Sequence, residues 1–303
     1  MTSRGESAQL EKPGATLRGR SCLITGASGT LGSAIARRMR REGADLLLVG
    51  RSGERLSALA KALAAEPGGE GALELLLVDL AAREAPERVA AAVAGRGALD
   101  VLVNNAAIQG PIGPLWENDW AAWEETIRVD LLAPVALCRA LVGPLSQSRR
   151  GKIINISGGG ASGPRANFTA YGAAKTGLVR FTESFAQEVR ARNIDVNAVA
   201  PGTIASAMTD SILAAGAARS GESEAAAAER AKTEGSRAAL EKAAALCLWL
   251  ASAKSDGISG RLLAALWDPW ATLDSRVSEL AGSDIYTLRR ITPKDRAKTW
   301  EPS

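Results

Sequence analysis

The sequence Thr25-Gly26-Ala27-Ser28-Gly29-Thr30-Leu31-Gly32 follows a short apolar segment, residues 21–25, and opens a segment with apolar residues at helical spacing, residues 31–41. Glycines between a strand and a helix let the backbone turn tightly, so a phosphate can approach the unpaired N–H groups at the helix start. Such glycines mean little alone, but their position between a first strand and a first helix is informative. The turn predicts a pyrophosphate site made of Gly26, Ser28, Gly29, Thr30, Leu31 and Gly32.

The rest of the chain repeats this alternation of strands and helices. We expect strands at residues 21–25, 44–50, 73–78, 101–104, 152–157, 194–199 and 262–266, and helices at 31–41, 54–65, 116–145, 170–192 and 238–251. The strand segments are continuous apolar runs, which is typical of a parallel sheet buried on both faces. The pattern predicts an α/β fold: a Rossmann-like, doubly wound, seven-stranded parallel sheet with strand order 3-2-1-4-5-6-7 and helices on both faces.

Residues 20–267 are expected to form one domain, with three regions that depart from the alternation. Residues 1–19 are polar and are expected to form a flexible arm. Residues 208–237 are rich in Ala, Ser, Glu and Gly; they can form a helix but have little apolar surface to bury, which favours a mobile flap. Residues 268–303 form an extension whose Trp270, Tyr286 and Trp300 are expected to pack on the domain or on a neighbouring subunit.

The composition excludes several classes of protein. The 303 residues include no histidine, which rules out Ser-His-Asp and Cys-His catalysis and any metal site built on imidazole. The three cysteines have no metal-binding spacing, so we expect buried thiols and no metal. Interspersed charges with a net +4 give no reason to expect nucleic acid as a partner. With no apparent secretory signal or membrane span, we expect a cytoplasmic protein, and the abundant Ala, Gly and Arg suggest a bacterial one.

The residues after the second and third strands indicate the cofactor. Gly50-Arg51-Ser52 ends the second strand. A carboxylate there usually accepts a hydrogen bond from the ribose 2′-hydroxyl of NAD, whereas an arginine suits the 2′-phosphate of NADP. A solvated loop arginine is the alternative. Asp79, followed by Leu80, ends the third strand and is placed to accept from the adenine amino group. These residues predict NADP(H).

Three further motifs identify a family. Asn104-Asn105-Ala106-Ala107 ends the fourth strand, Tyr171-Gly172-Ala173-Ala174-Lys175 opens a long helix, and Pro201-Gly202 follows the sixth strand. With the glycine turn, and over residues 20–267, the sequence resembles the short-chain dehydrogenase/reductase family in its shorter-chain branch. The resemblance implies that the cofactor also contacts Asn105, Ala106, Ala107, Tyr171, Lys175, Pro201, Gly202 and Ile204.

Tyr171 and Lys175 are four residues apart and therefore share one face of a helix. The resemblance implies that the tyrosine phenol protonates a carbonyl oxygen while NADPH delivers hydride. A nearby ammonium lowers a phenol pKa, and the same lysine would hold the nicotinamide ribose. The expected activity is NADPH-dependent reduction of a ketone or aldehyde on a small-molecule metabolite. The alternative is a non-redox NADP-binding protein on the same scaffold: a cyclase, an isomerase or epimerase, or a cofactor sensor.

Three positions depart from the family pattern. The family has a serine thirteen residues before the tyrosine, where this chain has Gly158. The substrate carbonyl would then be polarised by Ser157, which is slightly favoured, by Ser162, or by no serine at all. Asp130 replaces an asparagine that supports a water in the proton relay, so it serves a modified relay or marks altered chemistry. Thr30 replaces the middle glycine of the turn.

Assembly and substrate are predicted less directly. The helices at residues 117–146 and 170–192 carry more apolar residues than one sheet face can cover: Leu131, Leu132, Val135, Leu137, Leu141, Phe181 and Phe185. In relatives these helices form a symmetric interface, which implies a homodimer or homotetramer. Trp267 and Trp270 would suit a flat or apolar substrate or a sugar ring, and burial against the core explains them equally well.

Overall fold

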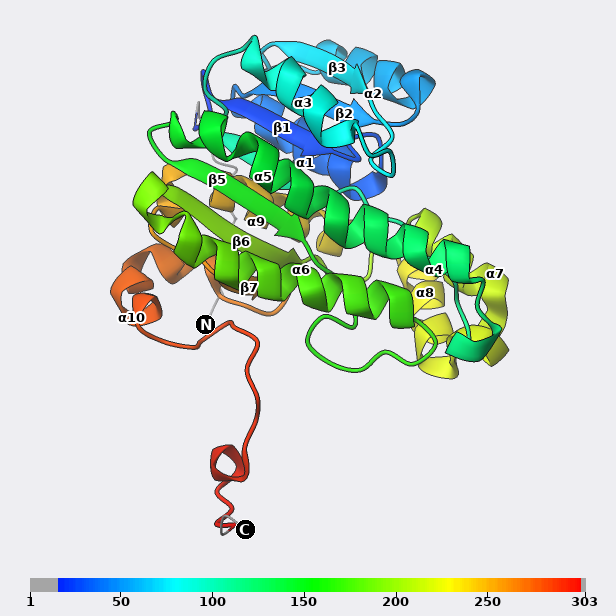
Figure 1. The fold of residues 1–303 in the computed structure, drawn as a ribbon. Helices are drawn as coiled ribbons and strands as arrows, with labels where there is room; N and C mark the ends of the chain where they lie inside the picture. Colours follow the sequence, from blue (N-terminus) through cyan, green and yellow to red (C-terminus); the bar gives the residue numbers. More distant parts are fainter. Residues whose placement is uncertain (1–15, 301–303) are drawn as a thin grey trace, which may run out of the picture.

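Seven parallel strands form one sheet in the order β3-β2-β1-β4-β5-β6-β7 (Figure 1). The computed structural model describes residues 16–300, so most of the predicted N-terminal arm lies outside the described residues. The strands are β1 Ser21–Thr25, β2 Asp45–Gly50, β3 Leu73–Leu77, β4 Val101–Asn104, β5 Gly151–Ile156, β6 Ile194–Ala200 and β7 Arg261–Ala264. The predicted fold and strand order are confirmed.

Helices cover both faces of the sheet (Figure 1). One face carries α1 Thr30–Arg41, α2 Gly53–Ala65 and α9 Arg237–Ala251; the other carries α3 Ala85–Ala94, α5 Ala133–Ser146 and α6 Thr169–Glu188. Successive residues of a strand point to opposite faces. Cys22 and Ile24 therefore pack in the core beneath α1, α2 and α9, whereas Leu23 packs in the core beneath α3, α5 and α6. Because both faces are covered, the strands are mostly apolar. Strands β5 and β6 also bury polar side chains, among them Lys152 and Asp195, which form an ion pair at 2.9 Å.

The edge strand β3 departs from the expected two-sided burial. Its Leu75 and Leu77 are 41% and 53% exposed, although the sequence of this strand is as apolar as that of the buried strands. An edge strand has a neighbour on only one side, so an apolar run does not guarantee burial there.

The predicted helix at residues 116–145 is divided. The segment consists of α4 Trp120–Ile127, a π-helical turn at Arg128–Leu132, and α5. The π turn carries Asp130, which is completely buried. The stretch Trp120–Ser146 is long and apolar enough to span a membrane by composition, but the core helix of a soluble protein passes the same test, and 44% of its apolar window is buried in the fold.

Residues 208–237 are largely helical. They form most of α7 Ala207–Ser220 and all of α8 Glu222–Thr233, which pack on each other beyond the carboxyl ends of the strands (Figure 1, yellow). Only Ala228 and Ala231 of α8 are buried. The pair therefore forms a cap that is held to the body by little apolar contact.

The C-terminal extension first packs on its own domain. Tyr286 accepts a hydrogen bond through its carbonyl from the N–H of Leu262 (2.8 Å), and the Arg261 guanidinium donates to the carbonyls of Ser283 (2.9 Å) and Ile285 (2.7 Å). Between β7 and this segment lies the short helix α10 Val277–Ala281. Beyond residue 288 the chain runs away from the body (Figure 1, red).

Candidate functional site

The glycine turn depends on very close backbone approaches. A Cβ built on Gly26, whose φ is +61°, would lie 2.8 Å from the Cα of Ala106. A Cβ on Gly32 would lie 2.3 Å from the carbonyl oxygen of Gly26. Helix α1 begins with Gly29 as its N-cap and has no side-chain cap, so its first N–H groups remain available to an anion.

The predicted motif Asn105-Ala106 supports this turn from the neighbouring strand. The Asn105 side chain donates to the carbonyls of Thr25 (2.9 Å) and Gly26 (3.1 Å). In return the Thr25 hydroxyl accepts from the backbone N–H groups of Asn105 (3.0 Å) and Ala106 (3.1 Å). Sequence reasoning did not identify this role of Thr25, which couples the ends of β1 and β4.

The structure places an additional cation beside the turn. Arg51 is exposed at the end of β2, and Ser52 caps α2. One helical turn later Arg55 donates to the carbonyl of Ser28 (2.9 Å), and this residue was not predicted. Asp79 is exposed after β3 and accepts from the N–H of Ala81 (3.0 Å). An uncapped helix start, backbone without obstructing side chains and two arginines fit a phosphorylated dinucleotide.

Tyr171 and Lys175 lie on α6, and both are buried. The Lys175 ammonium donates to the carbonyl of Ile156 (3.1 Å) at the end of β5 and lies 3.4 Å from Oδ2 of Asp130. The other carboxylate oxygen of Asp130 accepts from the N–H of Ile108 (2.9 Å). Helix α6, strand β5, the π turn and the segment after β4 therefore converge on one ion pair.

This ion pair sets the charge around the phenol. Burial raises the pKa of the Tyr171 hydroxyl above its ordinary value; the Lys175 ammonium opposes the rise, and the Asp130 carboxylate adds to it. Burial also raises the pKa of the Asp130 carboxyl, again opposed by Lys175. The Tyr171 phenol is therefore protonated at neutral pH.

Position 158 faces Tyr171 directly. A Cβ built on Gly158 would lie 2.2 Å from the Tyr171 hydroxyl oxygen and 3.0 Å from its Cε1 and Cζ atoms. The phenol thus occupies the space that a serine would take there. Ser157 is buried, and no residue in the described range hydrogen-bonds its hydroxyl, whereas Ser162 is exposed on the loop.

Arg165 covers the phenol, and no motif in the sequence indicated this. Its guanidinium carbon lies 3.9 Å from the ring centre of Phe168 and 5.5 Å from that of Tyr171. Glu224 on α8 accepts two hydrogen bonds from it, at 2.9 and 2.7 Å. A second ion pair, Arg219 with Glu117 (3.2 Å), joins α7 to the segment before α4.

The remaining predicted residues fall at the same edge of the sheet. Leu80 follows β3 and Ala107 follows β4; Pro201 and Gly202 follow β6, with Ile204 buried just beyond. Trp267 is 74% exposed, whereas Trp270 packs on Trp249 and donates to the carbonyl of Ala265 (3.1 Å). Within residues 16–300, no three His, Cys, Asp or Glu side chains form a cluster able to hold a metal ion.

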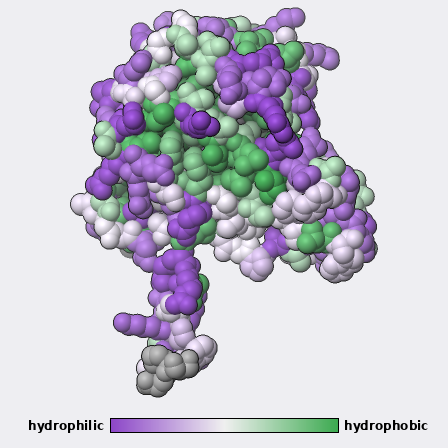
Figure 2. Space-filling view, in the orientation of Figure 1, coloured by the Kyte–Doolittle hydropathy of each residue, from purple (hydrophilic) through white to green (hydrophobic). Residues whose placement is uncertain are grey.

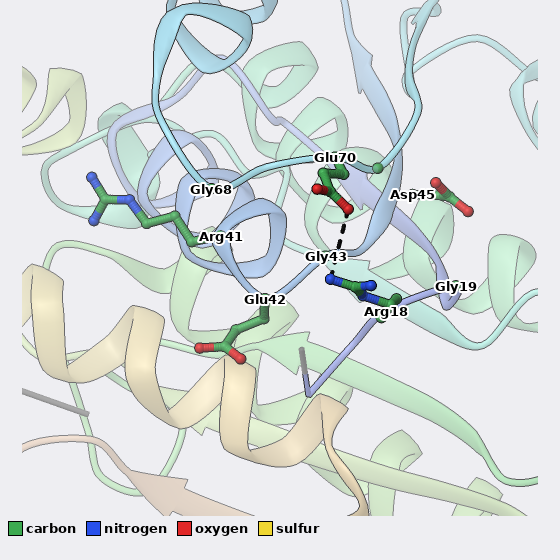
Figure 3. Close-up of a pocket in the computed structure, with 9 residues that line it drawn as sticks. Arg18, Gly19, Arg41, Glu42, Gly43, Asp45, Gly68 and Glu70 are labelled. Atoms are coloured by element: carbon green, nitrogen blue, oxygen red, sulfur yellow. Dashed lines mark ion pairs between the residues drawn. The ribbon is translucent and has the colours of Figure 1, made fainter. Parts of the chain in front are cut away.

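A depression on the opposite edge does not belong to this site (Figure 3). Arg18, Gly43 and Gly71 line it and precede β1, β2 and β3, so it lies at the amino ends of these strands. Its ion pair, Arg18 with Glu70 (3.6 Å), has side chains 71% and 83% exposed. Ligands of open α/β sheets bind at the carboxyl ends, where the glycine turn and Tyr171 lie.

Known proteins resemble this chain over most of its length. The family model of the short chain dehydrogenases matches residues 20–216. Nodulation protein G of Rhizobium sp. (strain N33) is 40% identical over 197 residues, which cover 65% of this chain and 78% of that protein. The 3-oxoacyl-(acyl-carrier-protein) reductase FabG of Aquifex aeolicus is 34% identical over 195 residues, covering 64% and 77%.

A solved structure extends the likeness. A putative NAD(P)-dependent gluconate 5-dehydrogenase from Beutenbergia cavernae, with bound NADP, superposes with a TM-score of 0.70 at 31% identity, covering 83% of this chain and 96% of that one. The family model ends within α7, so α8 and Glu224 lie beyond it. The match to residues 20–216 spans more than half of the sequence, and the glycine turn, Tyr171 and Lys175 all lie within it. The chain belongs to the short-chain dehydrogenase/reductase family.

Proposed function

We propose that this oxidoreductase uses NADPH to reduce a ketone or aldehyde on a small metabolite to the alcohol. The observation that carries the proposal is the buried phenol of Tyr171, next to the Lys175–Asp130 ion pair and at the same sheet edge as the glycine turn. A protonated phenol is the form that can donate to a carbonyl oxygen. The match to reductases such as FabG of Aquifex aeolicus supports the same direction of reaction.

Each group then has a defined task. When bound, NADPH would supply the hydride. The glycine turn, with Arg51 and Arg55, would hold its phosphates. The Tyr171 hydroxyl would hold the proton that passes to the carbonyl oxygen, and Lys175 would bind the ribose while remaining fixed by Ile156 and Asp130. The family pattern has two hydroxyl groups that can donate to the carbonyl, those of the tyrosine and of the serine thirteen residues before it. With glycine at position 158, this chain keeps the tyrosine hydroxyl and lacks the serine at that position.

Asp130 supports reduction over oxidation. An unopposed ammonium beside Tyr171 would favour the phenolate, which is the base needed to oxidise an alcohol. In this chain burial is the main cause that raises the pKa of the Tyr171 hydroxyl, and Asp130, 3.4 Å from the Lys175 ammonium, adds to the rise by compensating that charge. A carboxylate at position 130, in place of the family's asparagine, is consistent with a reductase.

Asp130→Asn is expected to shift the pH profile of reduction. Reduction requires protonated Tyr171, so its rate falls as pH rises through the Tyr171 pKa. Removing the Asp130 charge leaves Lys175 uncompensated and lowers that pKa. The basic limb of kcat/KM should therefore begin at lower pH, as measured by NADPH oxidation. Asp119→Asn, at an exposed N-cap, should leave the limb in place; an unmoved limb in Asp130→Asn would contradict this role.

Arg51→Asp is expected to reverse cofactor preference. The wild type should bind NADPH more tightly than NADH, and loss of a charged contact to the 2′-phosphate should cost roughly ten- to a hundredfold in NADPH affinity. Fluorescence titration of both cofactors measures the ratio. Lys61→Asp makes the same change of charge on α2, away from the glycine turn, and should preserve the ratio. Equal affinities in the wild type would make Arg51 a surface residue only.

A non-redox function is the second candidate, and the glycine at position 158, which removes one of the family's two hydroxyl donors, favours it. In that case the scaffold would bind NADP and act as a cyclase, an isomerase or epimerase, or a cofactor sensor. Binding followed by turnover separates the two candidates. If NADPH raises the melting temperature but no member of a carbonyl panel oxidises it, the non-redox function replaces the reductase.

The proposed enzyme acts as a homodimer or homotetramer through α5 and α6. Figure 2 shows hydrophobic atoms in the middle of this face, where Figure 1 places these helices. Leu132 is 54% exposed, and the half-buried Phe181 and Phe185 stack on each other. Leu137 and Leu141 are not part of this patch, because the core of the domain buries both.

Sedimentation at micromolar concentration should show a dimer or tetramer. Leu132→Asp should dissociate it, because a charge would enter an apolar contact repeated on both partners. Leu77→Asp, at an equally exposed leucine on β3, should leave the assembly intact. A monomeric wild type would contradict the proposal.

A further inference from the structure

Arg165 differs from the other cations of the site in the location of its partner. Lys175 is paired with Asp130, and both belong to the body of the domain. Arg165 also belongs to the body, on the loop after β5, but its carboxylate partner Glu224 sits on α8 of the cap. The partner of Arg165 can therefore leave without unfolding the domain.

The cap has a weak hold on the body. Helix α8 buries only two alanines, and a small apolar cluster of Ile112, Phe168, Ile212, Leu213 and Ala228 joins the cap to the loops below. Gly221, with φ +91°, separates α7 from α8. Of this cluster α8 itself contributes only Ala228, and burial of two alanines contributes little free energy, so displacing α8 costs little apart from its ion pairs.

Displacement of α8 would release Arg165, which lies over the phenol. Tyr171 is 7% exposed, and the Arg165 guanidinium lies over its ring. With α8 in place, the Arg165 side chain is 12% exposed and its guanidinium stacks on Phe168; when α8 moves, this guanidinium loses its carboxylate partner. A ligand that supplies a carboxylate can then form the same paired hydrogen bonds and gains affinity.

We propose that the substrate is an oxo acid, whose carboxylate replaces that of Glu224 on Arg165 while its carbonyl meets the Tyr171 hydroxyl. The paired hydrogen bonds from Nε and Nη2 of Arg165 to the two oxygens of Glu224 match the planar fork that carboxylates prefer. The guanidinium carbon lies 5.5 Å from the centre of the tyrosine ring, so the two groups are close enough neighbours for one short oxo acid to be expected to contact both. This inference rests on the proposed reductase for the reaction, but the anion site can be tested without turnover.

Matched acids and esters test the charge alone. Acetoacetate and levulinate would each be compared with their methyl esters in steady-state NADPH oxidation, giving an acid-to-ester ratio of kcat/KM. Arg165→Met should lower this ratio roughly ten- to a hundredfold, because it removes a charge-assisted pair of hydrogen bonds. Glu224→Gln removes the competing carboxylate and should raise the ratio. Arg219→Met breaks the other cap ion pair, away from Tyr171, and should leave the ratio unchanged.

Calorimetry separates binding from chemistry. With the protein loaded with NADP⁺, the ketone cannot be reduced, so levulinate and methyl levulinate report affinity alone. Selective binding of the acid, lost in Arg165→Met, supports the anion site even if no carbonyl is reduced, in which case only the reductase fails. Reduction of both esters with no preference for the acids, or an equal loss for acid and ester in Arg165→Met, overturns the oxo-acid proposal and leaves the reductase standing.

Discussion

Tyr171→Phe is expected to lower kcat by about 10²- to 10⁴-fold while NADPH affinity survives. The substitution retains the ring, which is buried beneath Arg165 and beside Lys175, and removes only the hydroxyl that carries the proton. The neighbouring charges remain paired, so the fold has little reason to change. Turnover is measured by NADPH oxidation with a carbonyl compound that the wild type reduces, and NADPH affinity is measured by fluorescence titration.

Lys175→Ala is the matched contrast. It removes a ribose contact and also leaves Asp130 buried without its cation, so both binding and turnover should fall. The two variants together distinguish the loss of a proton donor from general damage to the site. An unchanged rate in Tyr171→Phe, with an identified substrate, would falsify the proposed mechanism.

Gly158→Ala is expected to reduce turnover about 10²-fold or more, although it adds only one methyl group. A carbon at that position would lie 2.2 Å from the Tyr171 hydroxyl, far inside contact distance, so the phenol must move. A small displacement of a reacting group is enough for a loss of that size. Gly158→Ser, which restores the family's residue, should share the defect for the same reason.

Gly159→Ala provides the control. A Cβ at that neighbouring glycine would lie 3.6 Å from the Arg165 side chain, which is ordinary contact. Its stability and turnover should remain near those of the wild type, whereas Gly158→Ala should fold and bind NADPH but turn over slowly. A fully active Gly158→Ala enzyme would show that the phenol works from a different position.

Most of the sheet follows from local sequence. The apolar runs and the glycine turn predict β1 and α1, because these elements depend on residues close together in the chain. The strand order pairs distant segments such as β1 and β4, and it was expected from the doubly wound architecture. Gly26 and Gly32 could be assigned from the sequence alone, since their spacing between strand and helix is itself the signal. The glycine at position 158 could be found by counting back from Tyr171. The sequence did not show that the Tyr171 phenol occupies the space beside this glycine.

The parts that sequence did not reveal depend on distant contacts. Arg165 and Glu224 are 59 residues apart, and neither belongs to a recognisable motif. The helical pattern of residues 116–145 gave no indication of the π turn that buries Asp130. The leucines of β3 show the same limit, since apolar composition does not reveal that a strand lies at an edge.

The extension along β7 has a consequence for how copies of this chain can meet. A parallel sheet that ends in an open strand offers its free N–H and C=O groups to any strand that approaches. At β7 the Tyr286 carbonyl already holds the N–H of Leu262, and Arg261 binds the carbonyls of Ser283 and Ile285 in place of a further strand. Two copies therefore cannot join their sheets into one continuous sheet across β7 unless residues 283–286 first detach.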